Sequence, residues 1–296
     1  MKHIPVLLHE SIEGLHIQEN DVIVDATLGL GGHSSEICSQ TKNNIHIIGI
    51  DQDTNALEHA KTVLTQENCK TTFLLGNFRD IDVHLQNSGA EKIDGLLVDL
   101  GISSYQLDSS GRGFTFNKDE PLLMTMDESN EVLTAEYIVN KWSEETLSDI
   151  LHGFGEERYS RRIAKHIVEK RKEKPISTTF ELVEIIRKAV PWIYTKNKTH
   201  FATRTFQALR IAVNDELGAL KDVLEKGYDH LNAGGRMVVI SFHSLEDRIV
   251  KRFFRAKETE GEAHRINKKP ITPSEDELHS NPRSRSAKLR ILEKNT

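Results

Sequence analysis

The feature that most constrains the fold is a glycine-rich loop that directly follows a short apolar strand. Val22–Val24 has the composition of a buried strand, and the loop Asp25–His33 after it contains Gly29, Gly31 and Gly32. Glycine lets a backbone turn sharply and approach a ligand more closely than a Cβ atom would permit. A strand that opens into such a loop predicts a site for a nucleotide-like cofactor in an α/β protein.

A second acidic position supports this interpretation. Asp51 ends the apolar run Ile45–Ile50, about 20 residues after the loop, where a carboxylate can accept hydrogen bonds from ribose hydroxyls. A nicotinamide-binding loop would carry a third glycine or an alanine where Ser34 stands, and Asp25 closes the first strand. These two residues favour an adenosylmethionine-dependent methyltransferase. A simple glycine-rich turn stays the alternative.

Apolar runs alternate with helical segments through residues 1–100, which predicts a parallel sheet. Three further strands are expected, at Thr72–Leu75, Ile93–Leu100 and Arg236–Ser241. The alternation of strands and helices is interrupted between Ile93–Leu100 and Arg236–Ser241. We therefore predict a doubly wound, Rossmann-like sheet domain formed by residues 1–104 and 217–296. An inserted α-helical domain for substrate recognition is expected at residues 105–216.

The expected insertion is helical because its apolar residues recur at three- and four-residue steps. Successive helices are predicted over residues 134–190, and Thr178 with Glu181 three residues later has the pattern of a capping box. The same spacing predicts one longer helix from about Arg204 to Leu224. The polar stretch Glu258–Asn281 is expected to be disordered.

Charge is divided unevenly along the 296 residues, whose formal net charge is −6. Residues 1–100 carry 6 Lys and Arg against 15 Asp and Glu, whereas residues 156–210 carry 14 bases against 6 acids. Arg248–Lys257 adds five bases and no acid. This division suits an anionic polymer that is held away from the cofactor domain. A solvated helical face is the alternative for the basic segment.

The remaining composition narrows the class of protein. No apolar run approaches the roughly 20 residues of a membrane span, and the first residues lack the layout of a signal peptide, so a cytoplasmic protein without a membrane partner is expected. Cys38 and Cys69 form no Cys-x-x-Cys pair and are expected to be small buried residues rather than a disulfide framework. The 14 histidines show no zinc-binding spacing, so no metal site is predicted.

Ligands of open parallel sheets bind at the carboxyl ends of the strands, and polar or aromatic residues follow each expected strand. Asp51 would accept from the ribose, Phe78 would pack against the adenine, and Asp99 would accept from an amino group of the cofactor or the substrate. Gly31, Gly32 and His33 would line the methionine end of the cofactor. Phe78 as an ordinary core aromatic and His33 as a helix cap are the alternatives.

Methyl transfer from a sulfonium depends mainly on the alignment of acceptor, methyl and sulfur. Hydrogen-bond acceptors would help an exocyclic amine to react, so Asp99 is the first catalytic candidate. His243 and Arg248, with Glu246 and Asp247 between them, follow the last expected strand and could hold a base or a phosphate. Each of these four could equally be a surface or helix-start residue.

Long motifs in a fixed order resemble one bacterial family, which methylates the exocyclic N4 of a cytidine in 16S ribosomal RNA, in the decoding region of the small subunit. The motifs are Pro5–Leu8, Asp25–His33, Asp99–Ser104, Gln106–Asp108, Arg112–Phe114, Gly155–Arg158, Arg204–Arg210, Ser241–Arg248 and Arg283–Arg290. The resemblance spans essentially the whole chain. It implies a class I methyltransferase sheet with a helical insertion, adenosylmethionine as cofactor, and 16S ribosomal RNA within the small subunit as substrate.

The resemblance also extends the list of site residues. The family motifs place Gly31, Gly32, His33, Asp51, Phe78, Asp99 and Gln106 at the cofactor, and Gln106 is implied by the resemblance alone. An amino-methyltransferase of another RNA or DNA, and a non-catalytic ribosome-assembly factor, are the alternative functions. Bare RNA or an assembled subunit as substrate, and a homodimer, stay open.

Four departures from the family pattern concern substrate contacts more than the cofactor. Tyr105 stands where the family has a proline and could supply a stacking surface or only pack a loop. Leu123 and Thr125 replace a charged pair, and Phe201 replaces a second proline. The lost pair is the only hint of a non-catalytic protein, and the retained Asp51 and Asp99 oppose it.

Overall fold

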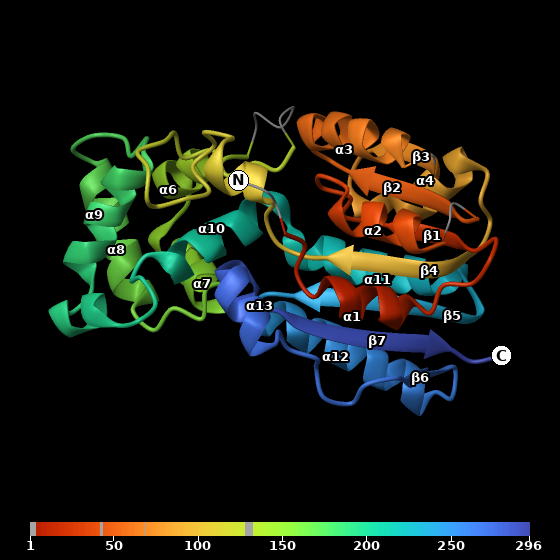
Figure 1. The fold of residues 1–296 in the computed structure, drawn as a ribbon. Helices are drawn as coiled ribbons and strands as arrows, with labels where there is room; N and C mark the ends of the chain where they lie inside the picture. The colour runs from red at the N-terminus through yellow and green to blue at the C-terminus, as the bar shows by residue number, and fades with distance from the viewer. Residues whose placement is uncertain (1–3, 42–43, 68, 128–132) are drawn as a thin grey trace. The chain divides into compact units, whose positions relative to one another are not determined.

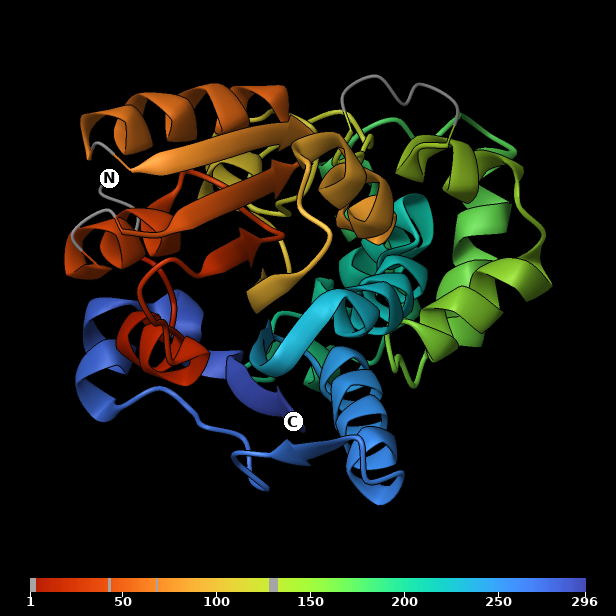
Figure 2. The same ribbon diagram turned by 90° about the vertical axis from the view of Figure 1, so that its right-hand side faces the viewer.

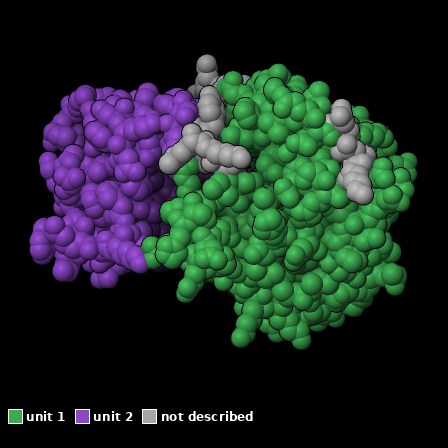
Figure 3. All heavy atoms as spheres, viewed as in Figure 1, with its two compact units in different colours: residues 1–101, 217–296 green, residues 102–216 purple. Residues whose placement is uncertain are grey.

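The computed structural model describes residues 4–41, 44–67, 69–127 and 133–296, with the backbone alone at Ser104 and Tyr105. The expected role of Tyr105 therefore lies outside the described side chains. The chain divides into two compact units (Figure 3). Residues 1–101 and 217–296 form one, called the sheet unit below, and residues 102–216 form the other, called the helical unit.

The sheet unit is built on one seven-stranded sheet (Figure 1). Its strands are β1 (Val22–Asp25), β2 (His46–Asp51), β3 (Lys70–Leu75), β4 (Ile93–Asp99), β5 (Leu231–Ser241), β6 (Ala263–Arg265) and β7 (Lys288–Lys294). The order across the sheet is β3-β2-β1-β4-β5-β7-β6. β1 to β5 pair in parallel, and β7 runs antiparallel to both of its neighbours. The Rossmann-like α/β sheet expected from the sequence is confirmed, with one reversed strand added.

Helices cover both faces of this sheet (Figures 1 and 2). They are α1 (Leu8–Leu15), α2 (Gly32–Thr41), α3 (Thr54–Gln66), the 3-10 turn η1 (Phe78–Asp80), α4 (Ile81–Ser88), α11 (Glu216–His230), α12 (Ser244–Thr259), α13 (Glu275–Ser280) and the 3-10 turn η3 (Pro282–Ser286). Successive strand residues point to opposite faces, so Ile23 joins the core under α1, α2 and α3 while Val24 joins the core under α4, α11 and α12. Two apolar faces explain why the parallel strands are continuous apolar runs.

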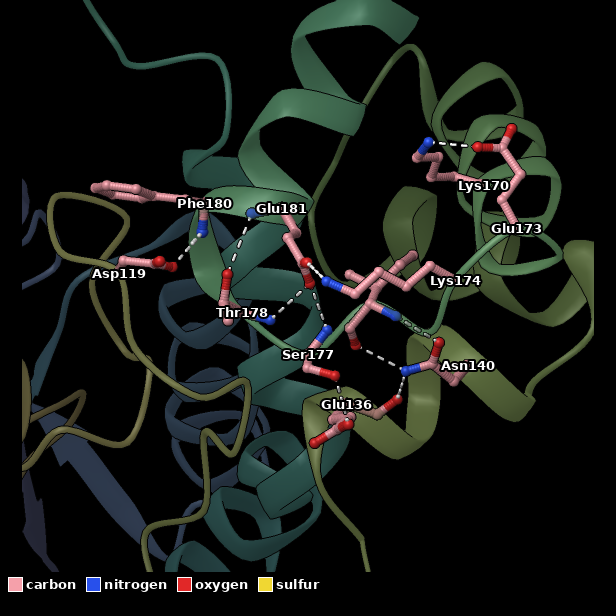
Figure 4. Close-up of polar contacts among 11 residues, drawn as sticks. Asp119, Glu136, Asn140, Lys170, Glu173, Lys174, Ser177, Thr178, Phe180 and Glu181 are labelled. Atoms are coloured by element: carbon pink, nitrogen blue, oxygen red, sulfur yellow. Dashed lines mark hydrogen bonds and ion pairs between the residues drawn. The ribbon is translucent and has the colours of Figure 1, made fainter.

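The helical unit has a core of its own, formed by α5 (Ser104–Asp108), α6 (Ala135–Lys141), α7 (Glu144–Gly153), α8 (Ser160–Arg171), α9 (Thr179–Ala189), η2 (Trp192–Lys196) and α10 (Thr203–Asn214). The inserted helical region is thereby confirmed. So is the capping box of α9, in which the Thr178 hydroxyl accepts from the Glu181 amide and the Glu181 carboxylate accepts from the Thr178 amide (Figure 4). The same carboxylate accepts from Ser177 and binds Lys174 (Figure 4).

Two expectations about secondary structure are wrong in detail. The long helix predicted from Arg204 to Leu224 is two helices, because Asp215 adopts a left-handed backbone (φ 48°) between α10 and α11. Apolar periodicity continues across the break and could not reveal it. The stretch Glu258–Asn281, expected to be disordered, contains β6 and α13, because pairing with β7 orders β6.

Cys38 and Cys69 form a disulfide, where two independent buried residues were expected. The two Cα atoms lie 5.8 Å apart although 31 positions separate them in the sequence. α2 carries Cys38, and Cys69 stands just before β3. The pairing depends on how these elements pack, which cysteine spacing does not encode. No helix in the described ranges is both long and apolar enough to cross a bilayer.

Candidate active site at the carboxyl edge of the sheet

Three carboxylates close three neighbouring strands of the sheet unit. Asp25 ends β1, Asp51 ends β2 and Asp99 ends β4. β1 lies between β2 and β4 and is parallel to both, so the three side chains come to the same edge of the sheet. The structure therefore brings these three strand-end acids to one edge, and their role in a site stays a prediction.

Asp25 has a structural task within the loop. Its carboxylate accepts from the Ser34 hydroxyl at 2.7 Å and from the Thr27 amide at 3.3 Å. Burial raises the pKa of Asp25 to about 6, although both hydrogen bonds favour the charged form. Asp25 thus ties the first turn of α2 to the end of β1. This explains why Ser34 stands where a nicotinamide site would have glycine.

The loop glycines are required by close packing as well as by backbone conformation. Gly29 and Gly31 have φ angles of +52° and +81°, which side chains disfavour. A Cβ atom on Gly31 would lie 3.3 Å from the Cβ of Ala60 in α3, and one on Gly32 would lie 2.5 Å from Pro5. These glycines let the start of α2 lie against its neighbours. The loop at the strand ends has no side chain at these positions.

Asp51 is held in place by backbone donors. Its Oδ2 accepts from the Gly29 amide at 2.7 Å, and its Oδ1 accepts from the Asp53 amide at 2.9 Å. Burial raises the pKa of Asp51 to about 6 against these bonds. Each carboxylate oxygen has a second lone pair, so an oriented carboxylate of this kind can still accept from two hydroxyls.

Asp99 is the least satisfied acid of the group. Its backbone amide donates to the Thr27 hydroxyl at 2.7 Å, which fixes the residue, and the side chain keeps 23% of its accessible surface. Its Oδ1 is buried and has no hydrogen-bond partner among the described residues. Burial, reinforced by the charges of Asp25 and Glu246, raises the pKa of Asp99 well above its ordinary value. A positively charged ligand would stabilise the ionised form of the Asp99 carboxylate.

His33 lies buried beside Asp99 rather than capping a helix. Its Nε2 is 3.1 Å from the carbonyl oxygen of Val6, and its Nδ1 is 4.0 Å from Asp99 Oδ2. A carbonyl can only accept, so Nε2 carries a proton and Nδ1 faces the carboxylate. In the sequence, the Pro5–Leu8 segment is recognised only as a family motif. In the structure its Val6 carbonyl orients His33, and Pro5 packs on Gly32.

Two expected cofactor residues are placed differently. Phe78 begins η1 after β3 and is half-buried against the core beneath α4 and α11. Gln106 belongs to the helical unit, in α5, where its side-chain oxygen accepts from the Ser103 amide at 3.0 Å. The sheet unit thus carries Asp51, Asp99 and His33 at the edge of its sheet, whereas Gln106 belongs to the helical unit.

The residues after β5 mainly build the start of α12. His243 is its N-cap, and its ring accepts from the Glu246 amide. Glu246 is buried and accepts from the amides of Phe242 and His243, and its Oε1 lies 3.1 Å from His243 Nε2. This segment is therefore a capping box in which the histidine and the carboxylate also face each other. Asp247 binds Arg290 of β7 at 2.7 Å. Arg248 is exposed on α12.

The strand order and the residues at the strand ends together define the class of protein. A sheet with strand order β3-β2-β1-β4-β5-β7-β6, a reversed β7, a glycine loop after β1 and a carboxylate after β2 is that of a class I adenosylmethionine-dependent methyltransferase. The residues fit this cofactor, because Asp99 Oδ1 is a buried acceptor that no described residue contacts by a hydrogen bond, and a sulfonium and an ammonium are cationic.

The chain belongs to the MraW methylase family, whose model matches residues 1–295. It is 48% identical to a ribosomal RNA small subunit methyltransferase H from Clostridium botulinum strain Kyoto, with 99% of each chain covered. Proteins with the same name from Clostridioides difficile (99% of this chain and 98% of that one) and a Paenibacillus species (99% of both) are each 45% identical. The family expected from the motifs is confirmed.

We predict that Asp99→Asn stabilises the protein in the absence of ligand. The raised pKa means that the folded state favours the protonated acid, so wild-type stability falls as pH rises above the ordinary value of 3.8 toward the folded pKa. The neutral amide removes this cost, and we expect the free energy of unfolding at pH 8 to rise by about 1–2 kcal/mol. Urea denaturation at pH 5 and pH 8 measures it.

The control is Asp82→Asn. Asp82 binds Lys226 at 2.8 Å, which lowers its pKa, so this variant should be unchanged or less stable by up to about 1 kcal/mol. If Asp99→Asn gave no gain at pH 8, or the same gain at both pH values, Asp99 would not be a strained acid.

Proposed function

We propose that the protein methylates the exocyclic N4 of a cytidine in 16S ribosomal RNA of the small subunit, with adenosylmethionine as methyl donor. The observation that carries the chemistry is the unpartnered, buried Oδ1 of Asp99 at the edge where Asp51 closes β2. The name shared by the full-length relatives supports the RNA substrate. The cytidine and its N4 rest on the motif resemblance.

We assign the cofactor to residues of the loop and the strand ends. Asp51 would accept from the ribose hydroxyls, and Phe78 would lie against the adenine. Gly29, Gly31, Gly32 and His33 would line the methionine end, with Asp99 accepting from its amino group. Gln106 is assigned to the cofactor on the family motif alone. Bound there, adenosylmethionine supplies a methyl group on a positively charged sulfur.

Asp99 has a second task in this proposal. A carboxylate that accepts from an exocyclic amine keeps the lone pair of the nitrogen directed at the methyl group and can receive a proton from it. The Thr27 hydroxyl holds Asp99 through its backbone, and His33 faces its other oxygen. His243 is better suited to positioning the segment after β5 than to proton transfer, because its ring caps α12.

Arg248 is proposed to hold RNA as part of a basic stripe on α12. Arg248, Lys251, Arg252 and Arg255 are exposed and recur at three- and four-residue steps, so they share one face of the helix. Phosphates are the groups such a face attracts. Substrate recognition by residues 105–216, a cytoplasmic location and a homodimer remain part of the proposal, and sedimentation velocity tests the last.

We expect the purified protein to transfer a labelled methyl group from adenosylmethionine to small-subunit ribosomal RNA or assembled small subunits, and not to DNA. Mass mapping of the product should place the methyl group on the N4 of one cytidine. Binding of the cofactor without transfer to either substrate would favour an assembly factor. Transfer to DNA would favour an amino-methyltransferase of another substrate class.

Asp51→Asn should weaken adenosylmethionine binding about 10- to 150-fold, because one charge-assisted hydrogen bond of about 1.5–3 kcal/mol is lost. Wild-type affinity should also fall as pH drops through about 6, where Asp51 becomes protonated. Asp25 titrates in the same range and is retained in the variant, so the difference between the two pH curves reports Asp51. Isothermal titration from pH 5 to 8 measures both effects, and Asp82→Asn is the control. Equal affinities of wild type and Asp51→Asn for adenosylmethionine would show that Asp51 does not bind the cofactor.

Lys251→Gln combined with Arg252→Gln should weaken RNA binding and leave cofactor affinity unchanged. If each base neutralises one phosphate of a single strand, the slope of log affinity against log salt should fall by about 1.4. Lys70→Gln is the matched control, because Lys70 is exposed at the start of β3, the opposite end of the strands. Filter binding at several salt concentrations gives the slope. An unchanged slope in the double variant would contradict a role for α12.

A further inference from the structure

A buried acid organises two aromatic side chains in the helical unit. Glu157 has no exposed surface, and its Oε1 accepts from the Tyr159 amide at 2.8 Å while its Oε2 accepts from the Tyr194 hydroxyl at 2.8 Å. Burial, together with the neighbouring Glu157, raises the pKa of Tyr194 to about 12, so its phenol stays a donor. The two rings meet edge to face with centroids 5.0 Å apart.

Two of the sequence motifs meet at this place. A Cβ atom on Gly155 would lie 2.5 Å from the Arg204 carbonyl oxygen, so only glycine lets α10 approach so closely. In return the Arg204 guanidinium donates to the Glu156 carbonyl at 2.7 Å, and Gln207 donates to the Phe154 carbonyl at 2.8 Å. The motifs Gly155–Arg158 and Arg204–Arg210 therefore fix each other, and the proposed methyl transfer leaves them unexplained.

The outcome is a set of aromatic and basic side chains that are exposed except for the half-buried Tyr159. The Arg158 guanidinium lies over the Tyr159 ring, 4.7 Å from its centroid, and Arg162 lies 5.9 Å from the same centroid. In η2, next to Tyr194, Trp192 is 72% exposed and the Lys196 ammonium lies 5.2 Å from its ring. We call Arg158, Tyr159, Arg162, Trp192 and Lys196 the aromatic–basic surface.

Packing within the protein does not account for this surface. An indole that is 72% exposed forgoes most of the roughly 1.5–3 kcal/mol that burial of a large apolar side chain supplies. Within the described ranges, Arg158, Arg162 and Lys196 also form no ion pair, so their charges are available to a partner. Aromatic rings among cations suit a polyanion with flat bases better than an apolar protein face.

We propose that the aromatic–basic surface binds an unpaired nucleotide of the substrate RNA. Its base stacks on Trp192, and the flanking phosphates meet Lys196, Arg158 and Arg162. This inference rests on the proposed function for the identity of the RNA. It adds a contact, made by residues other than those assigned to methyl transfer, that selects single-stranded RNA.

Tryptophan fluorescence tests the stacking without any turnover. The chain has two tryptophans, and Trp142 is partly buried against the helical core, so Trp142→Phe leaves Trp192 as the reporter. A short unstructured oligoadenylate should quench this fluorescence in a saturable, salt-sensitive manner, and a duplex RNA of equal length should quench it much less. No quenching, or equal quenching by the duplex, would overturn the proposal even if methyl transfer is demonstrated. Quenching would support it even if methyl transfer failed.

Trp192→Ala should raise the KM for bare small-subunit ribosomal RNA by about 5- to 150-fold, as expected for a stacking contact of about 1–3 kcal/mol. The turnover number and the KM for adenosylmethionine should stay unchanged. Trp192→Tyr keeps a flat ring and should restore most of the affinity. Circular dichroism of each variant checks the fold.

The matched control is Phe180→Ala. Phe180 is another exposed aromatic of the helical unit, 45% exposed at the start of α9, and its amide donates to Asp119 (Figure 4). Among the described residues, no basic side chain lies over its ring. This variant should bind RNA as wild type does. Equal effects of the two substitutions would overturn the proposal. So would a defect of Trp192→Ala seen only with assembled subunits, which would indicate a ribosomal protein as the partner of this surface.

Discussion

The hydrogen bond from the Gly29 amide to Asp51 is the contact on which the rest of the sheet unit depends. It joins the loop after β1 to the end of β2 at 2.7 Å. The bond requires Gly29 to adopt a φ of +52°, and the turn it closes lets α2 begin at Gly32. Burying Asp51 opposes folding, as its raised pKa shows, but the amides of Gly29 and Asp53 offset part of that cost.

Burial of the Asp99 carboxylate also opposes folding, but here hydrogen bonds do not offset the cost in the same way. Asp51 receives two backbone donors, whereas Asp99 Oδ1 receives none from the described residues and feels the charges of Asp25 and Glu246. A fold selected for stability alone would replace such an acid by an amide or an apolar residue. Glu157 of the helical unit shows the contrast, because it is buried with both oxygens accepting and no site is needed to explain it. The proposed function accounts for the difference, because it gives Asp99 a ligand as its partner.

Local pattern predicted the parts whose cause is local. The apolar runs predicted β1 to β5, the Thr178–Glu181 spacing predicted the cap of α9, and the glycine loop with Asp51 predicted the edge that holds the site. What failed depends on distant packing. β7 pairs with β5 and β6 pairs with β7, the disulfide needs α2 close to the residue before β3, and the left-handed backbone of Asp215 does not alter the apolar period. The capping role of His243 was also hidden, because histidine is an unusual N-cap.

Charge separates the two tasks that the protein has to perform. Buried acids at the strand ends suit a cationic cofactor, but residues 1–100, with 15 acids against 6 bases, repel a polyanion. RNA must therefore be held by positive charge supplied elsewhere, and the exposed bases of α12 and of the helical unit are of that kind. In the proposed reaction, the group that approaches Asp99 is the target base, which carries no charge. An enzyme built in this way gains selectivity for a nucleotide that can leave its helix, because the phosphates of a rigid duplex would have to approach the acidic edge together with the base.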